Sequence, residues 1–294
     1  MNKDSVFTVG ILGGYGKMGQ WLARFLQKEG KEVLIAGRNR DKLLDVARKL
    51  NVKAVSSEEV VRRSSAVILS VSINSFEAVV KEIAPHTRAG QFIFDVTSIK
   101  ARPVQIMHKY ISKGTILGVH PMFGPGASGI KGQKFVLTPT NTEEQALAEK
   151  TRAYLEVREA KAVLMEPAEH DEIMSIVLGL SHFIALVSAD TLAGLGKIKE
   201  SGLVSGTTYR MLLKMAEAVV SEDPDFYSSL QQNLPDTVKL ESLFTRKAGE
   251  WASLVNEGKR DEFIKKMRDL KDTLEKEDPE FNSAYHDMYR MLGE

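Results

Sequence analysis

Apolar and polar positions follow two alternating patterns through the first 165 residues of the chain. Short apolar runs have the composition of buried strands, and the segments between them repeat their apolar residues at helical spacing. The expected strands are 7–12, 32–36, 66–71, 91–96, 116–119, 135–138 and 162–165. The first expected helix ends near residue 28. The others are 42–50, 75–83, 103–112 and 142–155. Strands and helices in regular succession predict an α/β domain with a doubly wound, mostly parallel sheet.

The pattern changes at Pro167, after which no segment has the spacing of a further strand. We therefore expect two domains, a sheet domain of residues 1–166 and an all-α C-terminal domain of residues 167–294. Between 169 and 195 apolar residues cover almost every side of the expected helix, namely Ile173, Ile176, Val177, Leu180, Phe183, Ile184 and Val187. A helix that is apolar all round must be buried all round, and a second copy of the chain is the simplest cover. This pattern predicts a homodimer.

The same segment approaches the length of a membrane span, but its polar residues favour a buried core helix. It contains His182, Asp190 and three serines, and no basic cluster flanks it. The first ten residues also lack the apolar run of a signal peptide. We expect no membrane partner.

Composition narrows the possible functions. Hydrophobic residues make up 43% of the 294 residues, and 40 basic side chains balance 39 acidic ones to a net charge of +1. This balance gives no indication of nucleic acid or an anionic membrane surface as a partner. The absence of cysteine excludes disulfides, thiolate metal sites and cysteine nucleophiles, and it fits a cytoplasmic protein. No histidine spacing resembles a metal motif, so no metal site is predicted.

A glycine-rich segment follows the first expected strand and opens the first helix. Gly14, Gly16 and Gly19 have the G-x-G-x-x-G spacing, with Tyr15, Lys17 and Met18 between them. In such loops the first glycine makes the tight turn, the second lets backbone N–H groups approach a pyrophosphate, and the third lets helix and strand pack closely. The strand–loop–helix context predicts a Rossmann-type dinucleotide site formed by these residues, although a glycine-rich loop without a ligand remains the alternative.

The end of the second expected strand bears on which dinucleotide binds. An NAD site normally has an acidic residue there for the ribose hydroxyls, whereas this chain has Arg38 and Arg40. A guanidinium can bind a 2′-phosphate through two parallel hydrogen bonds. We therefore expect NADP, with Arg38 as the main contact, Arg40 as a secondary one, and NAD less favoured. The alternative is that both arginines are solvated and Asp41 caps the next helix.

Several polar residues stand at or just after the ends of other expected strands. Ser70 and Ser72 follow the third strand, Ser98 the fourth and His120 the fifth. Ligands of parallel sheets bind beyond the carboxyl ends of the strands, so these residues are expected to converge on the nicotinamide. Ser98 has a simpler alternative role as the N-cap of the helix that follows it.

His120 stands in the segment Gly-Val-His-Pro-Met-Phe-Gly-Pro-Gly, residues 118–126. Pro121 and Pro125 stiffen the chain after the histidine, and glycines allow a ligand close approach. A fixed neutral imidazole with a reference pKa of about 6.5 is suited to proton transfer. A rigid turn with a histidine that only satisfies local hydrogen bonds is the alternative.

The string HPMFGP closely resembles the signature of the prephenate/arogenate (cyclohexadienyl) dehydrogenase family. Three further segments resemble that family: DVTSIK at 95–100, HD with LSH at 170–182, and GLVSGTTYR at 202–210. The resemblance implies oxidative decarboxylation of prephenate to 4-hydroxyphenylpyruvate, with NADP, in tyrosine biosynthesis. It implies that His120 is the catalytic base, that Ser98 hydrogen-bonds His120 and the substrate, that His182 reaches the substrate and that Arg210 binds a substrate carboxylate.

The resemblance leaves several questions open. His170 is interpreted as a satisfied core histidine, and Lys100 is given no role. Arogenate carries an ammonium group that a nearby carboxylate should recognise, and residues 121–135 contain no acidic residue, which favours prephenate. Another NADP-dependent oxidoreductase, or a non-catalytic NADP sensor, could use the same scaffold. Neither a fused chorismate mutase nor a separate tyrosine-binding domain is expected.

Overall fold

The structure is a computed structural model that describes residues 7–293, so most of the amino-terminal stretch considered for a signal peptide lies outside it. The chain forms two compact units that meet at Met174 and Ser175. This division comes later than the predicted boundary at 166, because the helix that starts at Pro167 buries His170 and Asp171 in the first unit.

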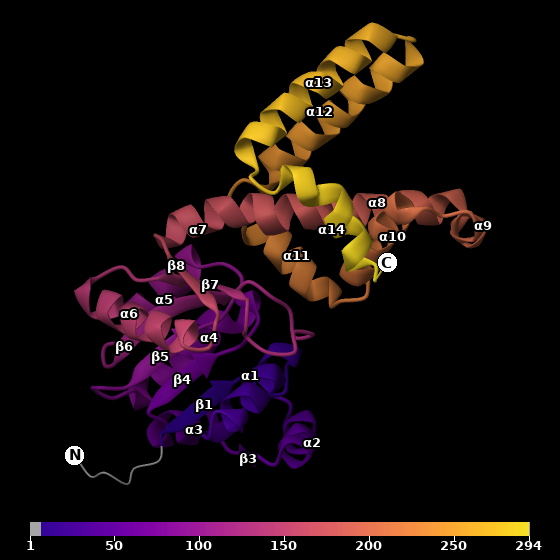
Figure 1. Cartoon of the computed structure of the whole chain (residues 1–294). Coiled ribbons are helices and arrows are strands. Elements are labelled where there is room, and N and C mark those ends of the chain that lie inside the picture. The colour runs from indigo at the N-terminus through magenta and orange to yellow at the C-terminus, as the bar shows by residue number, and fades with distance from the viewer. Residues whose placement is uncertain (1–6, 294) are drawn as a thin grey trace. The chain divides into compact units, whose positions relative to one another are not determined.

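The first unit is built on one eight-stranded sheet with the order β3-β2-β1-β4-β5-β6-β7-β8 (Figure 1). The strands are β1 (Thr8–Leu12), β2 (Glu32–Ala36), β3 (Lys53–Ala54), β4 (Ala66–Leu69), β5 (Phe92–Asp95), β6 (Thr115–Pro121), β7 (Lys134–Thr138) and β8 (Lys161–Leu164). Every neighbouring pair is parallel except β6 and β7, which are antiparallel. The predicted fold class is confirmed.

Helices cover both faces of this sheet. They are α1 (Lys17–Lys28), α2 (Arg40–Leu50), α3 (Ser57–Arg63), α4 (Ile73–Ile83), the short η1 (Ala84–His86), α5 (Ala101–Tyr110), α6 (Thr142–Glu156) and α7 (Pro167–Met174). One core cluster contains buried residues of α1, α2 and α6, and the other contains buried residues of α3, α4 and α5. The apolar faces of these helices thus form two cores, one on each side of the sheet, as in a doubly wound fold.

Local signals explain where the sequence prediction was incomplete. Strand β3 has two residues and α3 has seven, too short for a periodic pattern to stand out. Helix α2 starts at Arg40, and its cap is Asn39, whose Oδ1 accepts a hydrogen bond of 3.0 Å from the N–H of Lys42. Asp41, the cap in the alternative interpretation, lies in the first turn instead, where its charge interacts favourably with the helix dipole.

The second unit contains only helices among its described residues, which confirms the all-α prediction. They are the π-helical turn η2 (Ser175–Leu180), α8 (Ser181–Leu195), α9 (Ile198–Leu203), α10 (Thr207–Val220), α11 (Pro224–Asn233), α12 (Thr237–Asn256), α13 (Arg260–Glu277), η3 (Phe281–Ser283) and α14 (Ala284–Met291). Helices α12 and α13 lie side by side as a hairpin (Figure 1).

The long apolar helix is mostly exposed in the single chain. In the described part of the chain one helix, Pro167–Leu195, is long and apolar enough to cross a membrane by length and composition alone, and 22% of its apolar window is buried. Ile176 is 54% exposed and Leu195 is 65% exposed. The other helices of the described chain leave much of its surface uncovered, so its burial against a second copy of the chain stays a prediction.

Candidate active site

The glycine-rich loop makes its tight turn one residue earlier than the sequence indicated. Gly13 has a φ of +82°, and a Cβ there would lie 2.0 Å from the carbonyl oxygen of Ser70. Gly14 packs against Ile35, where a Cβ would approach to 2.6 Å. A Cβ on Gly19 would lie 2.4 Å from the Gly13 carbonyl, so this glycine does allow the close contact of helix and loop.

The start of α1 directly follows the glycine-rich loop. Gly16 is the N-cap and provides no side-chain hydrogen bond to the helix, and the N-terminus of a helix favours an anion such as a phosphate group. Lys17 begins the helix and Met18 follows it. The ring of Tyr15 lies against Gly37, where a Cβ would come within 2.5 Å of the ring. These residues fit the pyrophosphate end of a dinucleotide.

The remaining predicted cofactor residues also lie beyond strand ends. Arg38 and Arg40 are exposed directly after β2, and neither forms an ion pair with another described residue. Ser70 directly follows β4, and its N–H donates to the carbonyl of Leu12 at 2.9 Å. Ser72 is the N-cap of α4, and its Oγ lies 2.8 Å from the Oγ of Ser75.

His120 lies within β6 and not after it. The strand extends to Pro121 because β7 pairs with it antiparallel, and His120 stands opposite Val136. The side chain is 5% exposed. Its Nε2 has no hydrogen bond to another described residue. This atom is also not among the unpartnered polar atoms that the protein fully encloses. The ring is therefore held in the sheet with one nitrogen left open.

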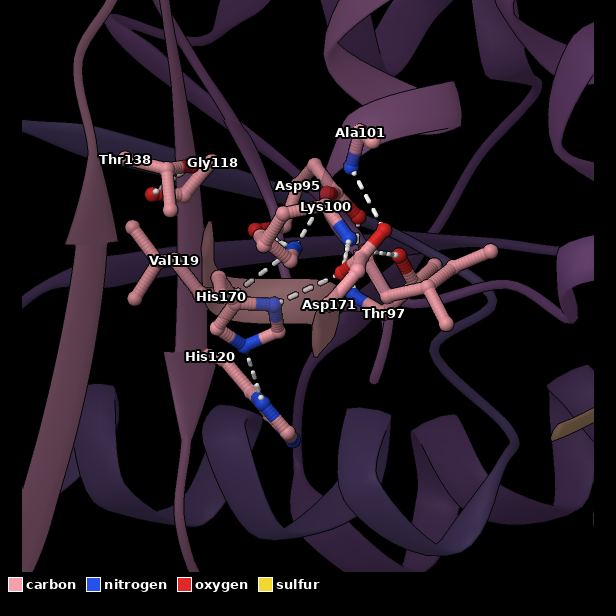
Figure 2. Close-up of polar contacts among 11 residues, drawn as sticks. Asp95, Thr97, Lys100, Ala101, Gly118, Val119, His120, Thr138, His170 and Asp171 are labelled. Carbon is pink, nitrogen blue, oxygen red and sulfur yellow. Dashed lines mark hydrogen bonds and ion pairs between the residues drawn. The ribbon is translucent and has the colours of Figure 1, made fainter. Parts of the chain in front are cut away.

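A chain of hydrogen bonds runs from His120 to the start of α5 (Figure 2). Nδ1 of His120 lies 2.9 Å from Nε2 of His170, and Nδ1 of His170 lies 2.7 Å from Oδ1 of Asp171. The two carboxylate oxygens of Asp171 also accept hydrogen bonds from the backbone N–H groups of Lys100, at 2.7 Å, and Ala101, at 2.9 Å. Asp171 thus caps α5 from another helix.

In the structure Ser98 neither hydrogen-bonds His120 nor caps α5. In the described chain the bonded nitrogen of His120 meets His170, so the orienting contact expected from Ser98 is not formed. Lys100 is the N-cap residue of α5, because the chain first turns through Thr97, whose hydroxyl donates to the carbonyl of Ile99 at 2.9 Å. Ser98 is half-buried in the loop after β5, and a role against substrate stays a prediction.

Lys100 and Asp95 form a fully buried ion pair beside this chain (Figure 2). Both side chains are 0% exposed. The Lys100 ammonium also donates to the carbonyl of Val119 at 3.2 Å, next to His120 in β6. The N–H of Thr97 donates to Asp95 Oδ1 at 2.8 Å. The pair therefore ties β5, the start of α5 and β6 together.

Burial sets the protonation state of the two histidines. It lowers the pKa of His120 well below its ordinary value, and the nearby Lys100 and His170 lower it further. Burial also lowers the pKa of His170, although its hydrogen bond to Asp171 acts in the opposite direction. Both rings are thus neutral at pH 7, as a proton acceptor must be. Burial likewise raises the pKa of Asp95 and lowers that of Lys100, each opposed by the partner's charge.

The two residues expected to reach substrate from the helical half lie in the second unit. His182 is in the first turn of α8, 4.7 Å between ring centroids from Tyr227, and burial lowers its pKa. Its Nδ1 is buried without a partner. Arg210 is half-buried in the first turn of α10, one residue after Tyr209, whose hydroxyl is also buried without a partner. Unpartnered buried polar atoms of this kind are typical of ligand sites.

Residues 7–293 contain no group of three or more histidine, aspartate or glutamate side chains that could hold a metal ion. Sequence reasoning missed His170, Asp171 and Lys100 as members of the site. The adjacent pair His170-Asp171 was visible as part of a family pattern, but its contact with His120 spans 50 residues of sequence.

The fold and this site define a Rossmann-type dinucleotide-binding domain followed by a helical domain. Residues 22–164 match the family described as "Prephenate dehydrogenase, nucleotide-binding domain", and residues 166–269 match "Prephenate dehydrogenase, dimerization domain". The chain belongs to the prephenate/arogenate dehydrogenase family.

Individual relatives agree with this assignment. The chain is 32% identical over 271 residues to "Probable arogenate/prephenate dehydrogenase" of Methanocaldococcus jannaschii, covering 91% of this chain and 61% of that one. It is 24% identical to "T-protein" of Haemophilus influenzae, covering 92% of this chain and 68% of the relative. The chain therefore spans about two thirds of the length of these relatives.

Solved structures share the fold. Prephenate dehydrogenase from Aquifex aeolicus, in complex with hydroxyphenyl propionate and NAD+, has a TM-score of 0.74 at 21% identity and covers 94% of this chain and 100% of its own. Arogenate dehydrogenase from Synechocystis has a TM-score of 0.68 at 17% identity, with 92% of this chain and 99% of its own covered.

Proposed function

We propose that this protein oxidises prephenate to 4-hydroxyphenylpyruvate, with loss of carbon dioxide, in the biosynthesis of tyrosine. The observation that carries the proposal is the environment of His120, a neutral buried imidazole with one nitrogen bonded inward and the other open. It lies at the end of a parallel strand, on the same edge of the sheet as the glycine-rich loop after β1. Family membership supports the substrate class.

The chemistry assigns each protein residue a limited task. A bound nicotinamide supplies the hydride acceptor. His120 accepts the proton of the ring hydroxyl as the hydride departs from the same carbon. The carbon–carbon bond to the ring carboxylate then breaks, and its electron pair moves through the ring onto the new carbonyl oxygen as carbon dioxide leaves. This restores the aromatic ring, and the oxygen takes back the proton held by His120. Ser98 is proposed to contact the substrate hydroxyl beside His120.

The experiment that tests this proposal is a direct comparison of prephenate and arogenate as substrates. The lack of acidic residues in 121–135 supports a higher kcat/KM for prephenate, because no carboxylate there can pair with the ammonium of arogenate. Relatives named for each substrate make both assays necessary. A preference for arogenate would reverse the substrate assignment. Turnover of neither substrate, with NADP binding intact, would leave a non-catalytic NADP-binding protein.

Substrate binding in the second unit is proposed for Arg210 and His182. A guanidinium can bind one of the two carboxylates of prephenate through two hydrogen bonds. Replacing Arg210 with glutamine is expected to raise KM about 10- to 100-fold, the equivalent of a lost charged hydrogen bond of about 1.5–3 kcal/mol, with a small effect on kcat. An unchanged KM would remove Arg210 from the substrate site.

NADP is the proposed cofactor, and Arg38 is the proposed contact for its 2′-phosphate. The support is the absence of an acidic residue at the end of β2 and the exposed guanidinium that follows it. Arg38→Ala is expected to weaken NADP about 10- to 100-fold and to leave the Kd of NAD unchanged. Arg48→Ala, at a highly exposed position on α2, is the matched control. Equal affinities of the intact protein for the two cofactors would refute the assignment.

A homodimer in the cytoplasm is the proposed setting. The family description of residues 166–269 names a dimerization domain, and α8 exposes a large apolar surface in the single chain. A monomeric mass in solution at micromolar concentration would contradict the dimer. The absence of cysteine supports a reducing compartment, which fractionation of the source cells would test.

A further inference from the structure

We propose that His170 and Asp171 are positioning residues that hold His120 in one tautomer, with the proton on Nδ1 and the lone pair on Nε2. The inference concerns the base of the proposed dehydrogenase reaction and rests on that function for its catalytic consequence. It makes Nε2 of His120 the atom that accepts the substrate proton. The argument runs along the hydrogen bonds of Figure 2.

Asp171 fixes the first proton. The backbone N–H groups of Lys100 and Ala101 can only donate, and they donate to both oxygens of the carboxylate, at 2.7 and 2.9 Å. Oδ1, which accepts from Lys100, also lies 2.7 Å from Nδ1 of His170. A carboxylate that already accepts at both oxygens is the acceptor in this third contact too, so Nδ1 of His170 carries the proton.

His170 passes this choice on to His120. In a neutral imidazole one nitrogen donates and the other accepts, so Nε2 of His170 carries a lone pair. That lone pair faces Nδ1 of His120 at 2.9 Å, and two lone pairs cannot face each other across a hydrogen bond. His120 must therefore donate through Nδ1. A doubly protonated His170 would donate to His120 through Nε2 and reverse the donor and acceptor of this hydrogen bond. Burial lowers the pKa of His170 and so keeps the ring neutral.

The consequence is a base that is ready before substrate arrives. Nε2 of His120 has its lone pair free and is the nitrogen without a partner among the described residues. When it accepts a proton, Nδ1–H still donates to His170, and His170 still donates to Asp171. The Asp171 carboxylate thus stabilises the protonated ring of His120 through the ring of His170. The positive charge of Lys100 destabilises that protonated ring, and the negative charge of Asp95 offsets the charge of Lys100. An aspartate that holds a histidine in one tautomer has the same role in other enzymes.

Two variants separate positioning from packing. His170→Phe keeps a planar ring but can neither accept from His120 nor donate to Asp171. His170→Gln keeps an amide oxygen that can accept from Nδ1–H of His120. We expect kcat to fall by about 100-fold or more in His170→Phe, within the range of losses for a misdirected general base, and to fall less in His170→Gln. KM and the Kd of NADP should change little in both.

The decisive readout is the nitrogen NMR spectrum of His120, assigned by comparison with His120→Asn. In the intact protein the spectrum should show Nδ1 protonated and Nε2 bare. In His170→Phe both tautomers should be populated, because nothing then selects one. His108→Asn, at an exposed position on α5, should change neither the spectrum nor the rate.

The two proposals fail in different ways. An unchanged tautomer of His120 in a folded His170→Phe protein, or Nε2 protonated in the intact protein, would overturn the positioning role whatever the activity. If His170→Phe does not fold, the spectrum of His170→Gln decides, because protonation on Nε2 there or in the intact protein contradicts the inference. Turnover of neither cyclohexadienyl acid would instead overturn the proposed function, and the spectrum would still decide the tautomer.

Discussion

Replacing His120 with asparagine is expected to lower kcat by about 10²- to 10⁴-fold, the usual contribution of a general base, and to leave the Kd of NADP unchanged. Asparagine retains an amide that can still meet His170, so the neighbouring hydrogen bonds keep a partner, but no basic nitrogen remains at the position of Nε2. The glycine-rich loop and Arg38 belong to other segments of the sheet edge and are untouched. Steady-state kinetics and a cofactor titration measure the two effects separately.

The pH profile of the intact protein provides a second check on this base. Because burial and the nearby Lys100 lower the pKa of His120 well below 6.5, the ring stays neutral as the pH falls through that value. The rate should therefore remain level near pH 6.5 and decline only at lower pH, where His120 takes up a proton before substrate binds. His108→Asn serves as the control. Near-full turnover of His120→Asn across this pH range would show that another group is the base.

The sheet domain was predictable because its signals are local. Each strand from β4 to β8 is an apolar run, and its ends differ from the prediction by a few residues. Where the prediction failed, pairing partners decided the outcome. β6 extends through His120 because an antiparallel neighbour, β7, provides hydrogen bonds that no local pattern reveals. Asn39, in an extended conformation, caps α2, whereas the alternative interpretation of Arg38 and Arg40 gave this role to Asp41.

The polar part of the site was less predictable because its contacts join distant segments. The family resemblance implied that Ser98 hydrogen-bonds His120, whereas its place after a strand only brings it to the same edge of the sheet. His170 is 50 residues from His120 in sequence, and its contact depends on how α7 packs against α5 and β7 within the first unit. A histidine followed by aspartate on an apolar helix gives no local sign of its partner. The same holds for Lys100, whose complete burial is unusual for a lysine.

That buried lysine makes the second large effect a loss of stability. Lys100→Met is expected to lower the free energy of unfolding by about 3–5 kcal/mol, the usual cost of leaving one charge of a buried pair uncompensated. Asp95 would keep the N–H of Thr97 as a partner but lose the ammonium that balances its charge. Urea unfolding of the intact protein and the variant measures the difference.

The pH dependence of this loss identifies its cause. Burial already raises the pKa of Asp95, and removing the ammonium raises it further, so folded Lys100→Met carries a neutral acid at pH values where the unfolded chain is ionised. The unfolded aspartate loses its proton above about pH 3.9, and the folded state then binds more protons than the unfolded one. The intact protein shares this loss up to its own raised pKa of Asp95. The variant should therefore become less stable, relative to the intact protein, as the pH rises from that pKa towards the still higher pKa of Asp95 in the variant.

A double variant isolates the pair from the packing around it. Asp95→Asn combined with Lys100→Met has no buried charge at this position, and neutral replacements of buried ion pairs are often as stable as the original. We expect the double variant to recover most of the stability that Lys100→Met loses and to lose the added pH dependence. If the stability lost by the double variant equals the sum of the losses of the two single variants, the two charges do not interact. In that case the packing of the two side chains, and not their pairing, would hold β5, α5 and β6 together.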